Sequence, residues 1–472
     1  MPVDYRHKHY DEHERKAQRV RDAVSGSDAV KRKGELYLPC PGGPLRNLRG
    51  DEYTKAESRY EAYIGRASWV GVTSRTHEGF LGAIFRKEPQ VDLPPSLDYM
   101  KQDADGSGMS LNQFGKVLCS NLMIEGRDGV LVDYPEADDG LTREQTQGLK
   151  ATLRFYSSSS IINWRREGER LTLIVLHETY EDQVDDFQAE CKDQYRVLSL
   201  ENDVYTQSVY RDGVIVEGST VQPKDASGST WNVIPFQFFG SVVNDENPDK
   251  PLLLDIADLN LGHYRNSADL EESSFITGQP MLHIDIGENT TAEEWDTLNP
   301  NGITVGSRRG IQTKGGSISM VQAEPNNLPK ELMADKERQM LSIGAKLIEQ
   351  SGSNETAEAV KARSGAETSN LSTIADNVSD GIENCLEWCA RFMDRNAEAA
   401  AEKVVFVLNK QFYPETTDPQ MIMARIAELD RGLIAKKDYR DWRRKGDGID
   451  ADRTDEMIEA EAQAGGTDIG VV

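Results

Sequence analysis

Three short groups of side chains in this sequence have residue types that could do chemistry. The first is His7, His9 and His13, near the start of the chain. Imidazoles at short intervals can bind zinc. The residues around them are polar and lack a regular apolar pattern, which is typical of a disordered segment. The sequence therefore predicts a polar, disordered arm with a short helix in residues 1–50, in preference to a metal site.

The second group is Asp103, Asp105 and Ser107, whose spacing resembles the opening of a calcium-binding loop. Such a loop needs a bidentate glutamate at its twelfth position, and this chain has Phe114 there. Ser110 precedes an apolar pattern of helical spacing and has the side chain of a good N-cap. We therefore expect a capped turn that leads into a helix.

The third group is Asp269, Glu271 and Glu272, near the end of a long helical pattern. Acids at a helix C-terminus oppose the helix dipole, so their presence needs an explanation. Paired carboxylates can act as acid and base, but no His or Lys lies nearby in the sequence. Two interpretations stay open, of which the first is favoured: a solvent-exposed face, or an acidic lining that repels phosphates.

Composition and motifs narrow the class of protein. The 472 residues include 54 Lys plus Arg against 80 Asp plus Glu, a net charge of −26. This balance argues against a basic DNA-binding face. No phosphate-binding loop, dinucleotide fingerprint, nucleophile elbow or zinc motif is present. We therefore expect neither an enzyme nor a cofactor.

Cysteines and apolar runs indicate the compartment. Five cysteines are too few and too scattered for a disulfide framework, which favours a reducing environment. Cys385 and Cys389 are four residues apart in a helical pattern and are expected in a core. We see no signal segment at the start and no apolar run long enough for a bilayer. A cytoplasmic product without a membrane partner is expected.

Periodicity predicts an α+β fold, with a helical framework around an antiparallel β module at about residues 154–245. Residues 52–87 have a helical pattern, residues 126–135 are a short strand, and Asp212-Gly213 is a hairpin signal. Two long helices are predicted on either side of a small insert. A third helix of roughly 38 residues follows, then a strand at 403–412 and three short helices.

With these elements in order, the chain resembles the portal proteins of tailed bacteriophages, in a subfamily known as a domain of unknown function. The resemblance covers roughly residues 35–415. It is carried by LYLPCPGG (36–43), AYIGRASWVGVTSRTHEGFLGAIFRKEP (62–89), EGRDGVLVDYP (125–135), PLLLDIADLNLGHYRNSADLEESSFITGQP (251–280) and NETAEAVKARSGAETSNLSTIADNV (354–378).

The resemblance implies a phage portal fold with a domain map. Its segments are an N-terminal arm and wing (1–250), stem helix 1 (251–278), the clip (279–325), stem helix 2 (326–349), the tunnel loop (350–356), a long helix and wing strand (357–413) and the crown (414–472).

It also implies site residues. The stem residues expected to line the channel are Asp269, Glu271, Glu272, Lys330, Lys336, Arg338 and Lys346. The tunnel loop is Gln350, Ser351, Gly352, Ser353, Asn354, Glu355 and Thr356, and it has no large apolar residue to grip DNA. The clip residues expected at an interface are Trp295, Arg308 and Arg309.

The function implied by the resemblance is a homo-oligomeric ring, usually a dodecamer, at one vertex of the capsid. Double-stranded DNA is packaged and ejected through it. The implied partners are the major capsid protein, scaffold, the terminase large subunit and then the head–tail adaptor. The ring is assembled in the host cytoplasm and ends in the virion. The alternatives are another virion structural or scaffold-binding protein and an uncharacterised cytosolic enzyme.

Overall fold

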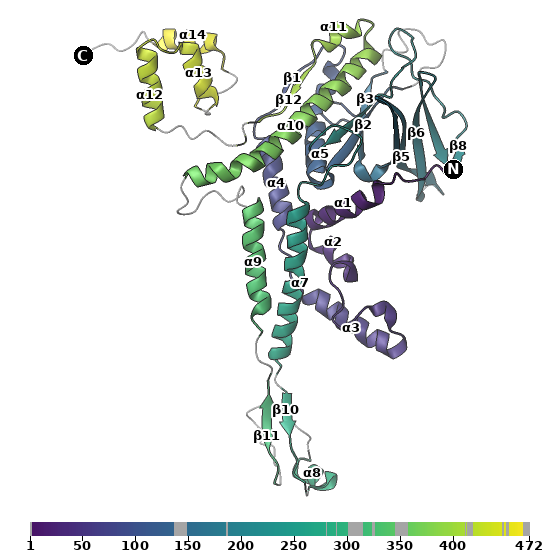
Figure 1. The fold of residues 1–472 in the computed structure, drawn as a ribbon, viewed down its shortest axis with the longest axis vertical. Coiled ribbons are helices and arrows are strands. Elements are labelled where there is room, and N and C mark those ends of the chain that lie inside the picture. The colour runs from purple at the N-terminus through teal and green to yellow at the C-terminus, as the bar shows by residue number, and fades with distance from the viewer. Residues whose placement is uncertain are drawn as a thin grey trace, which may run out of the picture.

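The computed structural model has a broad upper body, a slender pair of helices below it and a small β ribbon at the lower end (Figure 1). Three further helices lie beside the top of the body. The structure describes residues 2–135, 149–185, 187–279, 281–288, 290–300, 315–322, 326–344, 357–410, 412, 419–445, 448–449 and 453–465. It combines helices with antiparallel sheets, so the predicted α+β class is confirmed.

The helices of the body come from both ends of the chain. The α-helices are α1 (Tyr10–Ser25), α2 (Ser27–Arg32), α3 (Gly50–Arg66), α4 (Val72–Ile84), α5 (Leu111–Glu125), α10 (Ala357–Met393) and α11 (Ala397–Ala401), and the short 3-10 helices are η1 (Gly34–Leu36), η2 (Leu45–Asn47), η3 (Asp98–Lys101) and η4 (Ser158–Ser160).

The start of the chain contains a packed helix, so the predicted short helix is confirmed and the prediction of disorder is wrong. Ala17, Val20 and Ala23 of α1 are fully buried, and α1 packs on α5 and α7. Before the helix, the backbone N–H of His7 donates to the carbonyl of Ile162 at 2.8 Å. The side chains on the buried face of α1 are small and sparse, which makes its periodicity weak in the sequence.

The turn before α5 has the predicted capped form. The Ser110 hydroxyl accepts from the backbone N–H of Gln113, and the Gln113 side chain accepts from the N–H of Ser110, which completes a capping box. The carboxylate of Asp105 accepts from the N–H groups of Ser107 and Met109. The acids of this segment therefore stabilise the backbone of a turn.

The strands form four antiparallel sheets, in the orders β1-β12, β3-β2-β9, β4-β5-β6-β7-β8 and β10-β11. Their bounds are β1 (Gln90–Asp92), β2 (Arg127–Asp133), β3 (Thr152–Ser157), β4 (Ile161–Glu167), β5 (Arg170–Gln183), β6 (Ala189–Glu201), β7 (Val204–Arg211), β8 (Val214–Ile215), β9 (Phe236–Gly240), β10 (Met281–Ile284), β11 (Ile318–Val321) and β12 (Val405–Val407).

The predicted β module is divided between two of these sheets. Strands β4 to β8 form a meander, and its β7–β8 turn has Asp212 at φ 50° and Gly213 at φ 78°, as a tight hairpin requires. The outer strands β3 and β9 instead pair with β2 on either side. Strand β2 is buried along almost its whole length, since α5 and α10 pack against it.

Helix α10 closes the core of the body. The apolar side chains Leu371, Ile374, Val378 and Ile382 are all buried, as are the two cysteines of the next turns. The helix crosses β9, and Gly381 lies directly against the ring of Phe239. The predicted long helix and its core cysteines are confirmed.

Two further elements complete the body and the crown. Strand β12 pairs with β1, so residues 405–407 return to residues 90–92. The C-terminal segment 414–472, which the resemblance assigns to the crown, contains α12 (Pro419–Asp430), α13 (Lys436–Lys445) and α14 (Asp455–Gly465). Within the described part of the chain, no helix has the length and apolarity needed to span a bilayer.

Candidate functional site: the stem and the clip

Two antiparallel helices form the stem, which we define by α7 (Leu254–Thr277) and α9 (Leu328–Ile343). Helix α7 leaves the body and α9 returns to it (Figure 1). With 24 residues, α7 is about 36 Å long. Pro329 occupies the first turn of α9, where a missing N–H costs nothing. The stem therefore carries the residues between its helices well away from the body.

The seam between α7 and α9 is narrow and partly polar. His263 of α7 is 1% exposed in its side chain, and its Nε2 lies 3.1 Å from Oε1 of Glu337. Gly262, the residue before His263, lies under the aliphatic part of Lys336, where a larger residue would meet that side chain. Met340 is fully buried in the upper part of the seam.

The other sides of α7 are covered by the N-terminal helices. Asn260, fully buried, donates to the hydroxyl of Thr73 in α4 at 3.2 Å. Further down, Tyr264 and Ala268 pack in an apolar cluster with Tyr60 of α3. Helix α1 contacts α7 near the body. Helix α7 is thus enclosed over much of its length, whereas most side chains of α9 are exposed or half-buried.

Two of the three acids at the lower end of α7 are bound to α3. The hydroxyl of Tyr63 donates to Asp269 at 2.6 Å, and Arg66 forms an ion pair with Glu272. Burial raises the pKa of Tyr63, and the hydrogen bond to the carboxylate adds to the rise. Glu271 is exposed and has no ion pair among the described residues. The structure thus separates the three acids that the sequence grouped together.

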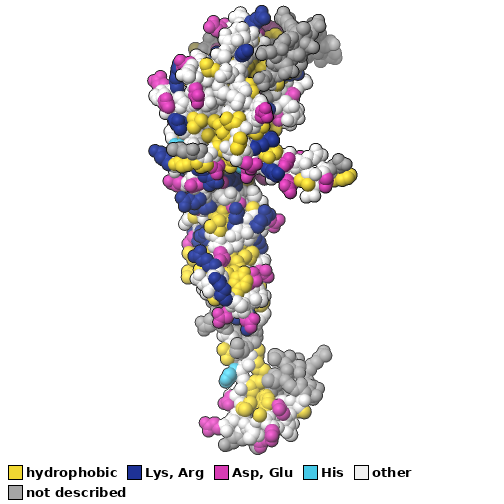
Figure 2. Space-filling model, turned by 90° about the vertical axis from the view of Figure 1, so that its right-hand side faces the viewer, with side chains coloured by type: hydrophobic (Ala, Val, Ile, Leu, Met, Phe, Trp, Pro, Cys, Tyr) yellow, Lys and Arg dark blue, Asp and Glu magenta, His cyan; other side chains and the backbone are white. Residues whose placement is uncertain are grey.

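The predicted cations of α9 also differ in their surroundings. Lys330 is exposed, Lys336 is half-buried on α7, and Arg338 is paired with Asp335. Lys346 and the tunnel loop 350–356 lie outside the described residues. On the face shown in Figure 2, positive and negative side chains both occur along the stem, with hydrophobic side chains between them. The stem surface on that face is mixed in charge.

The clip is a two-stranded ribbon with one short helix. Strands β10 and β11 pair from Met281 with Val321 to Ile284 with Ile318. Helix α8 (Ala292–Leu298) begins with a capping box between Thr291 and Glu294. The predicted small insert between the two long helices thus contains two strands and one short helix among its described residues.

Large apolar side chains are exposed on the clip. Met320 is 59% exposed, and Ile318 and Val321 are similarly open. A two-stranded ribbon is at best marginally stable alone. Of the predicted interface residues, Trp295 is half-buried, whereas Arg308 and Arg309 lie outside the described residues. The described clip therefore lacks a core of its own.

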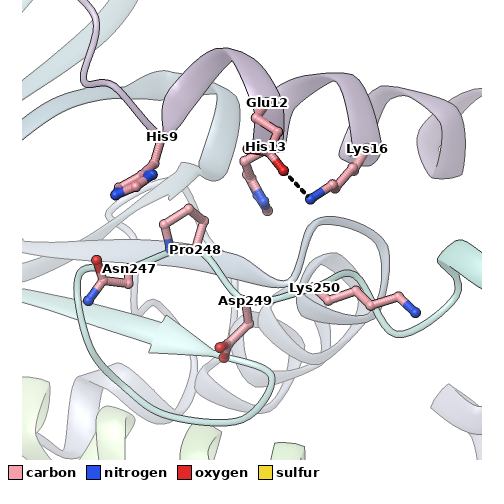
Figure 3. Close-up of a pocket in the computed structure, with 8 residues that line it drawn as sticks. All are labelled: His9, Glu12, His13, Lys16, Asn247, Pro248, Asp249 and Lys250. Carbon is pink, nitrogen blue, oxygen red and sulfur yellow. Dashed lines mark hydrogen bonds and ion pairs between the residues drawn. The ribbon is translucent and has the colours of Figure 1, made fainter.

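A cavity of about 270 Å³ lies between α1 and the loop before α7, lined by His9, Glu12, His13, Lys16 and residues 247–250 (Figure 3). Burial lowers the pKa of His13 to about 4, so its imidazole is neutral at pH 7. The carboxylate of Asp249 accepts from the backbone N–H groups of Val242 and Val243. Within the described residues, no three His, Cys, Asp or Glu side chains are placed to hold a metal ion.

A buried arginine joins the two sheets of the body, and sequence reasoning missed it. Arg127 donates to the carbonyls of Ile161 and Glu246 at 3.1 and 3.0 Å, and its guanidinium lies 4.2 Å from the centre of the Trp164 ring. Burial lowers its pKa to about 10. The available signal was the charged pair Arg127-Asp128 at the start of an apolar strand.

Parts of the chain are similar to known proteins. A family model described as a domain of unknown function, DUF4055, matches residues 251–393, which include the stem, the clip and α10. A comparison with curated proteins finds none that matches the chain. A chain in the neck of a native gene transfer agent particle, computed with C12 symmetry, is 12% identical. The match covers 80% of this chain and 91% of that one, with a TM-score of 0.41.

Two further solved structures are similar to parts of the chain. A chain in the virion of a native gene transfer agent particle is 12% identical over 78% of this chain and 88% of that one, with a TM-score of 0.40. An HK97-family phage portal protein from Corynebacterium diphtheriae is 10% identical over 71% of this chain and 91% of that one, with a TM-score of 0.29. The neighbours thus include particle-neck and portal proteins, beside a family model without an assigned function.

Proposed function

We propose that this chain is the subunit of a portal, a ring at one capsid vertex through which double-stranded DNA passes. The observation that carries the proposal is the antiparallel stem, which leaves the body and holds a small clip at its far end. The sequence resemblance over residues 35–415 supports the same function. A ring also gives the exposed apolar side chains of the clip a partner in the neighbouring subunit.

In this ring we place α9 toward the central axis. Helix α7 is already covered by α1, α3 and α4, whereas α9 has its exposed side free. DNA then passes along Lys330, Lys336 and Arg338, with Lys346 and the tunnel loop further along the path. Glu271 is accessible to the channel from α7. Asp269 and Glu272 act through α3, to which they are bound.

The remaining segments have roles that follow from their places in the ring. The clip docks the terminase large subunit during packaging and the head–tail adaptor afterwards. The wing meets the capsid protein and scaffold, and the crown faces the capsid interior. Assembly takes place in the host cytoplasm, and the protein ends in the virion. The chain acts as a conduit and carries out no catalysis.

Negative-stain images and the native mass of the purified protein test the proposal. Rings with a central hole wide enough for a duplex are expected, with a mass of about 630 kDa for twelve copies of a 52.7 kDa chain. Met320→Asp should lower the fraction of rings, and Ser319→Asp, on the other face of the same strand, is its matched control. A chain that stays monomeric at high concentration with scaffold added contradicts the portal assignment.

A further inference from the structure

The described part of the crown consists of three helices without a core. Among crown residues whose side chains the structure describes, none is buried. Met423 of α12 is 69% exposed, Leu433 after it is 70% exposed, and Met457 of α14 is 55% exposed. Three helices of 10 to 12 residues with open apolar faces are too small to be stable alone. Their apolar side chains need a partner.

The contacts inside the crown hold the helices together by charge and aromatic side chains. Arg440 of α13 lies 2.9 Å from Glu459 of α14, and Arg444 pairs with Asp455. The guanidinium of Arg425 lies 5.8 Å from the centre of the Trp442 ring, which links α12 to α13. These contacts are at the surface, so each contributes little to stability.

Charge in the crown is separated between two helices. Helix α13 has six cations and two acids in ten residues, whereas α14 has four acids and no cation. Lys436, Arg440 and Arg444 are four residues apart and therefore lie on one side of α13. The two arginines are bound to α14 of the same chain. Lys436 and Lys437 have no ion pair in the described part of the chain, and neither has Glu456.

We propose that the crown of a second copy of this chain completes the crown, with the first turn of α13 against α14 of the neighbour. Charge complementarity favours this occupant, because one copy offers unpaired lysines and the other an unpaired glutamate. The two surfaces are different, so the contact is heterologous and repeats around a closed ring. The contact also buries exposed apolar side chains of one copy, such as Leu433, against Met457 of the neighbour. The inference rests on the proposed function for the ring itself.

Charge reversal in the full-length protein tests this contact. Lys436→Glu with Lys437→Glu should raise the protein concentration at which half of the chains are in rings by roughly tenfold, since each exposed pair contributes a modest free energy. Glu456→Lys should act in the same direction. The combination of all three substitutions should recover most of the loss, because the complementary charges are then exchanged. Sedimentation velocity at low and high salt gives the ring fraction.

Arg431→Glu is the matched control, as it reverses an exposed charge outside α13 and should leave ring assembly unchanged. Unchanged assembly in every variant overturns the proposal, and so does a combination that fails to recover the loss. If the lysine variant forms rings normally but binds less double-stranded DNA, the surface faces DNA and the proposal is wrong. Failure of the wild-type chain to form rings contradicts the proposed function instead.

Discussion

His263 of α7 and Glu337 of α9 meet across the stem, with Nε2 of the histidine 3.1 Å from a carboxylate oxygen. The imidazole is buried, whereas the glutamate is 52% exposed at its side chain. This hydrogen bond joins the two stem helices at the middle of the seam. Met340, one turn further along α9, is fully buried.

Glu337→Ala should loosen α9, because it leaves a buried imidazole nitrogen without a partner. A loss of about 1–3 kcal/mol is expected for such a group. Hydrogen exchange of the backbone amides in residues 328–343 measures the effect. Glu337→Gln keeps a hydrogen-bonding side chain and should stay close to wild type. Equal protection in the alanine variant would show that the contact does not hold the helix.

Glu271→Lys and Glu272→Lys are adjacent charge reversals with different expected results. Glu272→Lys removes the partly exposed ion pair with Arg66, which should cost about 1 kcal/mol in the docking of α3 on α7. The backbone amides of α3 should therefore exchange their hydrogens faster. Glu271→Lys should leave α3 unchanged and slow DNA passage in a packaging assay. DNA packaging at the wild-type rate in the Glu271 variant would show that Glu271 does not line the channel.

Gly381→Ala should destabilise the body, because an added Cβ would overlap the buried ring of Phe239. An overpacked core of this kind costs about 1–3 kcal/mol. Gly82→Ala in α4 is the control, because no atom lies within 4 Å of its added Cβ. That variant should gain about 0.5–1 kcal/mol from helix propensity. Urea denaturation of both variants measures whether the free energy of unfolding falls for Gly381→Ala and rises for Gly82→Ala.

Acid should weaken the docking of α1 through His13. The pKa of His13 is about 4 in the folded chain and 6.5 in an unfolded one, so the unfolded state binds more protons between these values. Stability from this residue is therefore present above pH 6.5 and is lost as the pH falls toward 4.

The contribution of His13 is about 1–2 kcal/mol between pH 7 and pH 5. Burial raises the pKa values of Glu125 and Asp128 nearby, which gives a pH dependence of opposite sign. The measurement is therefore the difference between wild type and His13→Gln in denaturant unfolding at each pH. A difference that does not change with pH would contradict the buried neutral histidine.

The elements that the sequence predicted well are those with long regular periodicity. The pattern of α10 steps by three and four over many turns, and its buried side chains follow it. The same reasoning joined α3 and α4 into one helical segment at 52–87, although residues 67–71 between the two helices are not helical. Both helices are apolar at their adjoining ends, so the pattern alone did not show the break.

Contacts between distant segments could not be predicted from local patterns. Tyr63 and Asp269 are 206 residues apart in the chain, and nothing in either segment indicates the other. The acids of α7 appeared to lack partners because sequence reasoning searched only their neighbourhood. The partners of Arg127 could not be predicted either, because its acceptors are backbone carbonyls, which every residue has.

Gly344 has a mechanical consequence for the far end of the molecule. It lies where α9 meets the body. A Cβ added at this position would lie 3.2 Å from the side chain of Phe80 and 3.3 Å from that of Ile256. A side chain at residue 344 would therefore press on Phe80 and Ile256 and tilt α9 against the body. Over the 16 residues of α9, about 24 Å, a tilt of about 5° would move the lower end of the helix by about 2 Å. The packing around Phe80 thus helps to set where the far end of α9 lies, next to the clip.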